Sequence, residues 1–569
     1  MLHRTASVLL RRAPILTLLL MLGPVAAGLF GTLLPALGYL PALGAQDLGV
    51  ATYAALLEWP GLPRAVWLSI STGLAATLIS FVAVMLIVAG WHGTRSFVML
   101  ERALSPLLSV PHAAAAFGLA FLIAPSGWVA RLFSPWATGW ARPPDLLILQ
   151  DPAGITLIAG LVAKEIPFLL LMTLAALPQA NPRKAMLVAR TLGYTQINGW
   201  FLTVFPAVYR QIRLPIYAVL AFSMSVVDVA LILGPSTPPT LAVQVVKWMN
   251  DPDLTLRLQA AAGACLQLGL VVVTLVLWRV GESVVAAAGR RWILHGNRGV
   301  PIMNGVLRLS GLSVAALSGL AVFFGLVGLL VWSLAGLWQF PDLMPRAFTL
   351  RSWDRHGAGM LDPFCETILI GLASTVLSLF LVIACLEAEH RHGLRPGARA
   401  LWLLYLPLIV PQIAFLGGLQ TLAIGTGLDG GRIAVILAHL VFVLPYVFLS
   451  LADPWRNWDT RVDTVARALG ANPWRVLWRL RLPMLLRPVL TAAAVGFAVS
   501  VGQYLPTLLV GAGRIQTLTT EALALSSGGD RRVIGIYALA QTAVAFAPFG
   551  LALLLPKVLW RDRRGMTHG

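Results

Sequence analysis

The chain has 569 residues, of which 58% are apolar and only 11% are charged, and its mean hydropathy is +0.81. Soluble globular chains average about 45–50% apolar and about 25% charged residues. The composition therefore excludes a soluble enzyme, a disordered regulator and a disulfide scaffold. The formal net charge of +19 would indicate nucleic-acid binding in a soluble chain, but in a membrane protein it first reports which segments face the cytoplasm.

Twelve apolar segments are long enough to cross a bilayer, which takes about 20 mostly apolar residues. The first follows three arginines, as a signal peptide would. Its length exceeds the usual apolar core of about 7–15 residues, which favours a retained helix. We expect spans at residues 14–40, 65–90, 106–124, 154–177, 214–234, 258–278, 309–337, 364–386, 400–424, 433–451, 488–511 and 533–556.

Basic residues alternate between high and low numbers along the connecting segments. With the N-terminus inside, the inside segments carry 29 of the 42 Lys and Arg residues and the outside segments carry 12. Because cytoplasmic loops are enriched in Lys and Arg, both termini are predicted to be cytoplasmic. The charge is therefore a topology signal: membrane lipid is an expected partner, and nucleic acid is not.

The two halves of the chain share a set of anchors in the same order. Residues 189–193 (Ala-Arg-Thr-Leu-Gly) match residues 466–470 (Ala-Arg-Ala-Leu-Gly) at an offset of 277, and Pro206 and Pro483 each follow thirteen residues after the glycine. We expect an all-α integral membrane fold of about twelve transmembrane helices in two parallel six-helix repeats, residues 1–300 and 301–569. A pseudo-twofold axis along the membrane normal should relate the repeats.

Each repeated motif lies in the segment after the fourth span of its half and is predicted to form a short helix, a turn and a second short helix. In the first half, Asn181 should cap the first helix and Thr195 the second. Ala185, Ala189 and Leu192 should share one face, while a left-handed residue ends the helix. That residue is Gly193.

In the second half Asp459 takes the capping position and Gly470 ends the helix, with a second cap at Asn472. The shared face is formed by Val462, Ala466 and Leu469. Two such elements with small residues facing outward predict docking surfaces. The alternative is a pair of basic loops that lie on the lipid, but the identical spacing of both loops disfavours it.

This Ala-x-x-x-Gly pattern, followed by a hydrophobic residue and a proline, resembles the "EAA" loop of permease subunits of binding-protein-dependent ABC importers, most like the ferric-iron and thiamine-type branch. The resemblance implies a bacterial inner-membrane permease with two copies of a cytoplasmic ATP-binding subunit and one external solute-binding protein. The family's glutamate is replaced by Leu187 and Thr464, with an acidic residue beside the latter. The residues implied to contact the ATPase are Ala185, Ala189, Leu192, Gly193, Pro206, Val462, Asp463, Ala466, Leu469, Gly470 and Pro483.

Enzyme motifs are missing from the sequence. None of the four lysines is followed by Ser or Thr, so the phosphate-binding P-loop of an ATPase is not present. The cysteines and histidines show no CxxC or HExxH spacing, and no Gly-x-Ser-x-Gly motif occurs. We expect no enzymatic activity, no metal and no cofactor on this chain, with ATP bound by a partner subunit.

Few ionisable residues lie inside the predicted spans, where charges are costly and mark function by default. Lys164 and Glu165 lie near the middle of the fourth span, either as a neutralised pair that locks helices together or as lining of the passage. Asp228 lies in the fifth span and aligns with Gln503 of the second half. The two could face each other across the axis, or Asp228 could bond to hydroxyls of a neighbouring helix or to Lys164.

These observations favour an importer permease that works by alternating access. The alternative is a twelve-span secondary transporter driven by an ion gradient, with Asp228 or Glu165 carrying protons. A membrane scaffold is a third interpretation. An acidic residue in the passage favours a cation as solute, although the solute-binding protein often sets recognition in the resembled family.

Overall fold

The computed structural model describes residues 2–104, 106–394, 397–428 and 430–559. Within these residues all regular structure is helical apart from two isolated β-bridges, which confirms the all-α membrane fold. Nine helices there are long and apolar enough to cross a membrane, or up to eleven spans if each of two bent helix pairs counts as one. The predicted twelve exceeds this number. The segment expected as the fifth span lies largely in α10 (Phe205–Ser225), whose first half carries Arg210 and Arg213.

The α-helices of the first 300 residues are α1 (Leu2–Ala36), α2 (Ala51–Glu58), α3 (Leu62–Trp91), α4 (Arg95–Leu104), α5 (His112–Ile123), α6 (Trp128–Phe133), α7 (Ile155–Ala176), α8 (Pro182–Thr191), α9 (Gln196–Thr203), α10, α11 (Asp228–Leu233), α12 (Leu241–Met249) and α13 (Leu256–Leu294). Those of the remainder are α14 (Pro301–Leu334), α15 (Arg351–His392), α16 (Ala398–Ile409), α17 (Gln412–Thr426), α18 (Arg432–Arg456), α19 (Thr460–Ala468), α20 (Pro473–Val476), α21 (Leu482–Met484), α22 (Leu486–Val501), α23 (Leu505–Val510), α24 (Leu518–Ser526) and α25 (Arg531–Leu559).

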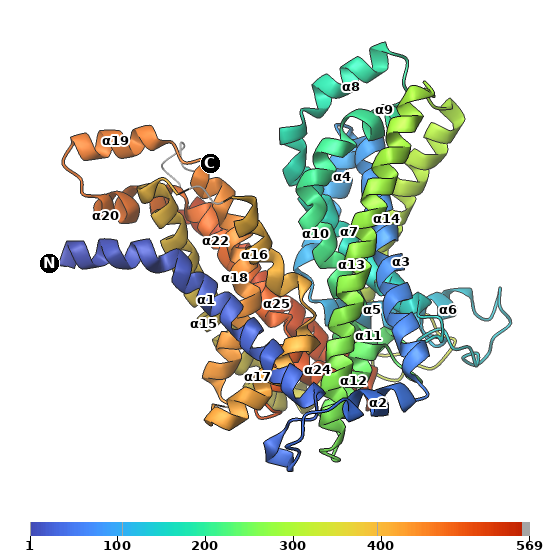
Figure 1. Ribbon diagram of the computed structural model, residues 1–569. Helices are drawn as coiled ribbons and strands as arrows, with labels where there is room; N and C mark the ends of the chain where they lie inside the picture. The colour runs from blue at the N-terminus through green and yellow to red at the C-terminus, as the bar shows by residue number, and fades with distance from the viewer. Residues whose placement is uncertain (1, 105, 395–396, 429, 560–569) are drawn as a thin grey trace.

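The helices form two lobes (Figure 1). One lobe contains α3 to α11 with α13 and α14, and the other contains α15 to α23 with α1. The ribbons of the lobes spread apart toward the end that carries α8 and α19, and they meet at the end that carries α12 and α24. We call the first end the loop face and the second the opposite face.

The first helix of each half packs against the third span of the other half. Helix α1 packs most extensively against α17, and α14 packs against α5. A Cβ added at Gly418 would lie on the backbone of Gly28, and one added at Gly325 would lie 2.8 Å from the backbone of Gly118. Small residues let membrane helices approach this closely. The same contact thus recurs at corresponding positions of the two halves, which supports the internal repeat.

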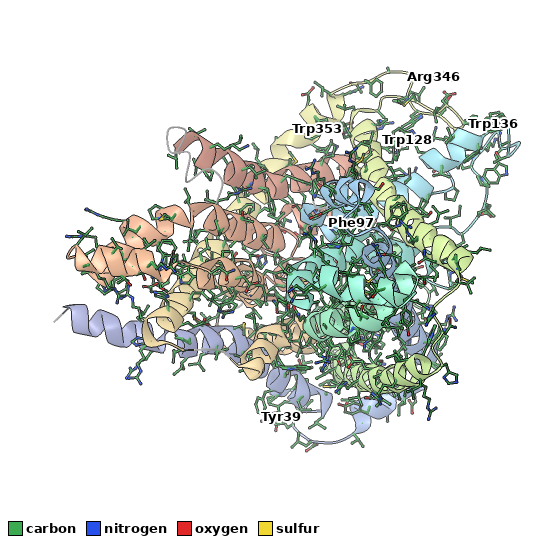
Figure 2. All side chains as sticks on the ribbon, turned by 90° about the horizontal axis from the view of Figure 1, so that it is seen from above. Tyr39, Phe97, Trp128, Trp136, Arg346 and Trp353 are labelled. Carbon is green, nitrogen blue, oxygen red and sulfur yellow. The ribbon has the colours of Figure 1, made fainter. Side chains whose placement is uncertain are left out.

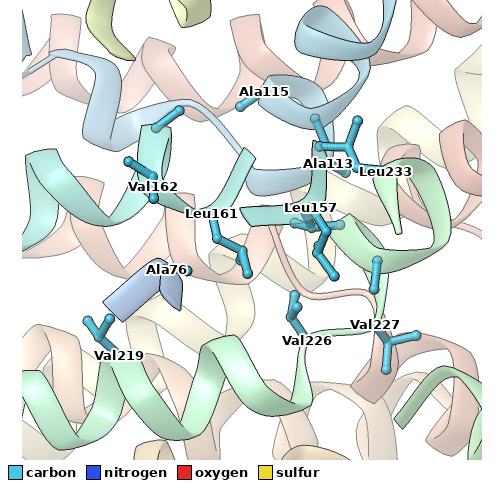
Figure 3. Close-up of a cluster of buried hydrophobic side chains, with 14 of the residues drawn as sticks. Ala76, Ala113, Ala115, Leu157, Leu161, Val162, Val219, Val226, Val227 and Leu233 are labelled. Carbon is cyan, nitrogen blue, oxygen red and sulfur yellow. The ribbon is translucent and has the colours of Figure 1, made fainter. Parts of the chain in front are cut away.

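Two kinds of break interrupt the helices inside the lobes. Pro111 and Pro411 each precede a helix in the third span, and in the second half the helices around Pro411 bend by 84°. Proline accounts for both breaks, because it lacks a backbone N–H and disfavours the helical conformation in the residue before it. A second break separates α10 from α11 at Val226 and Val227, which face Leu157 of α7 in the apolar cluster of Figure 3. The corresponding break lies between α22 and α23.

Candidate coupling loops and intramembrane charges

The helices α8 and α19 end with the same backbone structure. Gly193 has φ +82° and Gly470 has φ +83°. In each loop the glycine N–H donates to the carbonyl three residues back, and the next N–H donates to the carbonyl five residues back, at 2.9–3.1 Å. This pair of bonds is the Schellman motif, which a left-handed glycine completes. The helix ends predicted from the two glycines are therefore confirmed.

The side chains of both helices show the same pattern of burial. Ala189 and Ala466 are buried at 1% and 8% exposure, whereas Leu192 and Leu469 are exposed. Ala189 packs within its own loop, because a Cβ added at Gly199 of α9 would lie 2.9 Å from it. The expectation that the small residues face outward is therefore wrong for both alanines. The exposed apolar side chains are Leu187, Val188 and Leu192 in the first loop and Val465 and Leu469 in the second.

Ala185 and Val462, which were expected to share the docking face, are partly buried. Pro206 and Pro483 lie in the first turns of α10 and α21, where the fixed φ of proline suits the start of a helix. Pro206 thus marks where the first loop re-enters a helix, whereas Pro483 lies within a run of short helical segments that begins at Pro473.

Capping differs between the loops. Asp459 accepts the N–H of Arg461 at 2.9 Å and Asn472 accepts that of Arg475 at 2.8 Å, as predicted. Asn181 precedes α8 but has φ +45° and forms no capping hydrogen bond through its side chain, and neither does Thr195 before α9. The backbone of Thr195 instead donates to the carbonyl of residue 298, so tertiary contacts replace the expected cap.

The first loop is held by the segment that joins the two halves. The N–H of Thr195 donates to the carbonyl of Arg298 at 2.9 Å, and the N–H of Ile197 donates to the side-chain oxygen of Asn304 at 3.0 Å. Gln196 donates to the carbonyl of Ala89 at 2.9 Å. The loop is therefore fixed to α3 and α14 through neutral hydrogen bonds.

The second loop is held by a cluster of charges. Asp463 is 4% exposed, and its carboxylate contacts Arg481, His390 at 2.8 Å and the indole N–H of Trp458 at 2.9 Å. Arg481, 1% exposed, also pairs with Glu387 of α15. The structure thus directs Asp463 into its own chain, whereas the family resemblance implied contact with the ATPase. The cluster of charges fixes α19 to the end of α15.

The charged state of Asp463 follows from these partners. Burial alone would raise the pKa of its carboxyl group. The hydrogen bonds from Trp458 and His390 and the charge of Arg481 outweigh burial, and the pKa lies below its usual value. Asp463 therefore carries a full negative charge at neutral pH.

Sequence reasoning missed Glu387, His390, Arg481 and Trp458 as well as the joining segment. One signal was available: Arg481 lies two residues before Pro483 in an apolar stretch, and Glu387 and Arg391 are four residues apart at the end of a predicted span. Their meeting depends on long-range packing, which residue spacing does not encode.

Lys164 supports a break in the neighbouring helix. It is 4% exposed, and its ammonium donates to the carbonyls of Leu107, Leu108 and Val110 at 2.9, 3.3 and 2.6 Å. These carbonyls lie just before Pro111, where the third span is interrupted, and within the described part of the chain only that of Leu107 also accepts a backbone N–H there, from Val110 at 3.3 Å. The geometry gives Lys164 a structural role in the first lobe.

Two acidic residues of the first half lie near tyrosines of the second half. Glu165 is 4% exposed and Asp228 is partly buried. Glu165 lies close enough to Tyr446 of α18, and Asp228 to Tyr504, for each pair to interact electrostatically. Glu165 and Asp228 come from α7 and α11 of the first half. Each carboxylate thus lies within electrostatic range of a phenol of the second half.

A helical membrane fold with two equivalent loops at one face and a few ionisable residues inside its helices is typical of a transport permease. Residues 368–556 match the family described as binding-protein-dependent transport system inner membrane component. The inner membrane ABC transporter permease protein YnjC of Escherichia coli (strain K12) is 33% identical over 556 residues, 96% of this chain and 98% of that protein.

Two shorter relatives cover part of the chain. The putative 2-aminoethylphosphonate transport system permease protein PhnV of Salmonella typhimurium is 25% identical over 212 residues, 37% of this chain and 79% of that protein. The molybdenum transport system permease protein ModB of Mycobacterium tuberculosis is 32% identical over 183 residues, 28% of this chain and 68% of that protein.

The chain belongs to the family of ABC importer permeases. It is a multi-pass inner membrane protein and a transport subunit without an ATPase site of its own, and a partner subunit uses the ATP. Family membership also implies a solute-binding protein as partner. It does not support the ion-driven secondary transporter that the sequence left open.

Proposed function

We propose that the chain forms the solute passage between its two lobes and opens it alternately to each side of the membrane, driven by two copies of a cytoplasmic ATPase that bind α8 and α19. One observation carries this proposal. The two loops share the same turn, the same buried alanine and the same exposed leucine at one face of the molecule. Because the spreading of the lobes is greatest there, a partner that draws the loops together would rock the lobes.

The proposed topology places both termini and the loop face in the cytoplasm and the opposite face outside, where the solute-binding protein would dock. The functional units are the parallel repeats 1–300 and 301–569. Each unit exchanges its first helix with the other, as the glycine contacts of α1 and α14 indicate. The repeats therefore act as a pair and not as separable domains.

The docking surface that we propose consists of the exposed side chains of the two loops and differs from the face expected from the sequence. Val188 and Leu192 on one loop and Val465 and Leu469 on the other are accessible to a partner. Gly193, Gly470, Pro206 and Pro483 shape the loops, and Ala189, Ala466 and Asp463 hold them from inside. Ala185 and Val462 lie at the edge of the surface.

The proposed passage lining is Glu165 with Tyr446 and Asp228 with Gln503 and Tyr504. What supports it is their placement across the two halves next to the broken fifth spans. Lys164 is not included, because three carbonyls hold its ammonium.

Two considerations bear on the solute. The acidic lining favours a cation, and the resemblance to the ferric-iron and thiamine-type branch agrees with a cation. PhnV, in contrast, is named for 2-aminoethylphosphonate, whose phosphonate is an oxyanion. Uptake tests should therefore include both charge classes.

The test is retention of the ATPase by a tagged permease purified from its own host. We expect ATP hydrolysis to co-purify with the wild-type chain and to be lost in the Leu192→Asp/Leu469→Asp double variant. Both leucines are exposed, so membrane levels should not change. Leu254→Asp, at another exposed leucine that lies at the opposite face, is the control and should retain the ATPase. Retention by the double variant would contradict the proposal.

A further inference from the structure

Four arginines line one cavity at the opposite face. The cavity has a volume of about 580 Å³ and lies among α6, the loop after α14 and the start of α25. Its basic lining residues are Arg131, Arg142, Arg531 and Arg532. The acidic lining residue is Asp530, whose carboxylate already accepts the backbone N–H of Arg532 at 3.0 Å. The lining is therefore strongly cationic.

Two of these guanidinium groups are held close together. Arg131 is 4% exposed and donates its Nε to the carbonyl of Ser126 at 3.0 Å. Arg531 donates to the hydroxyl of Ser126 at 2.7 Å and to its carbonyl at 3.4 Å. Both lie over the ring of Trp332, at 5.9 and 5.2 Å from its centroid. Two like charges thus share one serine and one indole, which is costly without a counter-charge.

Within the described residues, neither guanidinium of this pair has a carboxylate at ion-pair distance, although the charge of Asp342 acts on Arg131 from further away. Arg131 donates its Nη1 to the backbone carbonyls of Gln339 and Asp342 at 2.8 and 2.7 Å. The carboxylate of Asp342 pairs with Arg346 instead, at 3.2 Å. Among the residues that the structure describes, none of the four lining arginines forms an ion pair.

Aromatic rings fix the guanidinium planes. Arg131 lies 4.7 Å from the centroid of Trp338 and 5.5 Å from that of Phe340, and Arg531 lies 5.5 Å from Phe121. A guanidinium edge matches the paired oxygens of an oxyanion. The donors open to such an anion are the N–H groups of the lining arginines that Ser126, Gln339 and Asp342 do not already engage.

The cavity wall is built by two segments far apart in sequence. The indole N–H of Trp128 in α6 donates to the carbonyl of Leu343 at 3.1 Å. Figure 2 shows Trp128 and Arg346 near each other at one edge of the molecule. Under the proposed topology, four of the twelve external basic residues gather in this one cavity, whereas the positive-inside rule disfavours basic residues outside.

We propose that this cavity binds a tetrahedral oxyanion of the sulfate or phosphate type at the outer face. Arg531 and Arg532 are partly exposed, so a compact anion in the cavity can reach their guanidinium groups, and the buried Arg131 adds positive charge beneath it. A free oxyanion and the phosphate of an anionic lipid share this chemistry. The inference rests on the cavity and, for its placement outside, on the proposed topology, but it does not depend on how the loops bind the ATPase.

The test measures binding of radiolabelled inorganic sulfate and phosphate to the purified permease in chloride buffer by equilibrium dialysis. We expect saturable binding that weakens by at least about tenfold in Arg531→Gln and in Arg532→Gln, since each removes a charge-assisted donor. Arg351→Gln, which removes one positive charge from an exposed position of the same face, is the matched control. Arg131 is left intact because it holds the loop carbonyls.

A second arm identifies the source of the anion. The permease is placed in nanodiscs of phosphatidylcholine with and without phosphatidylglycerol, and bound lipid is quantified after delipidation. Phosphatidylglycerol retained by the wild type and lost in Arg531→Gln supports a lipid headgroup as occupant, whereas sulfate or phosphate binding unaffected by this lipid supports a free oxyanion.

Two results would overturn the inference. One is no saturable sulfate or phosphate binding at millimolar concentration together with equal phosphatidylglycerol retention by the wild type and Arg531→Gln. The other is a loss of binding in Arg351→Gln as large as in Arg531→Gln. Retention of the ATPase is a separate measurement, so failure of the coupling proposal leaves this one standing.

Discussion

At the scale of single residues, Gly470 offers the cleanest test of the coupling turn. Its φ is +83°, and a Cβ added there would meet no atom within 4 Å. Only the backbone conformation therefore opposes substitution, at a cost of about 1–3 kcal/mol for a β-branched residue. We predict that Gly470→Val reaches the membrane at near-normal levels but retains less ATPase and supports no uptake.

Gly470→Asn is the matched control, because asparagine tolerates the left-handed conformation. Pull-down of the ATPase and solute uptake are measured for both variants. Gly193→Val should behave like Gly470→Val, with added contact against Arg298, whose Cδ lies 3.3 Å from the added Cβ. Normal uptake by Gly470→Val would show that the turn is not needed for coupling.

Asp463 supplies the second prediction at this scale. Asp463→Asn should leave Arg481 with less counter-charge in a buried site, and breaking a buried pair costs about 3–5 kcal/mol. Because the loss falls on the attachment of α19, we expect faster tryptic cleavage at Arg461 and Arg467. Asp459→Asn makes the same charge change in the same loop but keeps an N-cap, so its cleavage should stay at the wild-type rate.

The stability that Asp463 gives to the attachment of α19 should be lost at low pH and kept at neutral pH. A carboxyl group with a lowered pKa in the folded protein contributes stability above its unfolded pKa of about 3.9 and loses it as pH falls through the folded value. Amide-exchange protection of α19 should therefore be constant from pH 8 to 5 in the wild type and fall below about pH 4. A fall near pH 6 would assign the effect to another group.

The sequence predicted some residues of the site better than others. Local rules for how a helix ends predicted a left-handed conformation at Gly193 and Gly470, and both glycines adopt it. The directions of Ala189, Ala466 and Asp463 could not be predicted, because burial on a short helix depends on which neighbour covers it. His390 and Glu387, about 75 residues before Asp463 in the chain, provide that neighbour.

Among the helices, the contact between α1 and α17 has a sharp steric requirement. A Cβ at Gly418 would lie within 2.6 Å of the backbone around Gly28 and Gly31. We predict that Gly418→Ala separates the helices and lowers the unfolding free energy by about 1–3 kcal/mol, as overpacking does. The measurement is thermal unfolding of the purified permease in detergent.

Gly425→Ala in the same helix is the control, since a Cβ there would meet nothing within 4 Å. Alanine favours the helix over glycine by roughly 1 kcal/mol, so this variant should be unchanged or more stable. Equal midpoints for Gly418→Ala and the wild type would show that α1 does not need this close approach.

Most helices could be predicted, because the length of an apolar segment and the positions of its prolines largely determine where a membrane helix runs and where it breaks. The breaks at Pro111 and Pro411 followed from proline chemistry alone. The exchange of first helices between the halves did not, since nothing in the local pattern of residues 14–40 distinguishes a helix that packs on its own half from one that packs on the other. The break after Ser225 was also missed, because Val226 and Val227 look like a continuing span.

For the whole molecule, the spread of the two lobes at the loop face predicts a movement. If two ATPase subunits close on each other when ATP binds, α8 and α19 should approach. We expect the distance between spin labels at Lys184→Cys and Thr460→Cys, exposed positions outside the proposed docking side chains, to shorten when a non-hydrolysable ATP analogue is added to the assembled complex with solute-binding protein. The three free cysteines, Cys265, Cys365 and Cys385, are replaced first.

Labels at Lys184→Cys and Trp292→Cys, at the loop-face end of the same lobe, serve as the control and should keep a constant distance. An unchanged distance between the loops under conditions that support uptake would contradict rocking of the lobes.

The exchange of first helices also sets an order of assembly. Helix α1 enters the membrane first, but its main packing surface, α17, is synthesised roughly 380 residues later. At translation rates of about 5–20 residues per second, the glycine face of α1 waits roughly 20–80 s in contact with lipid. The nascent first half is therefore an unfinished structure that a membrane chaperone or protease can engage, and a mutation that slows the second half would expose the first to degradation.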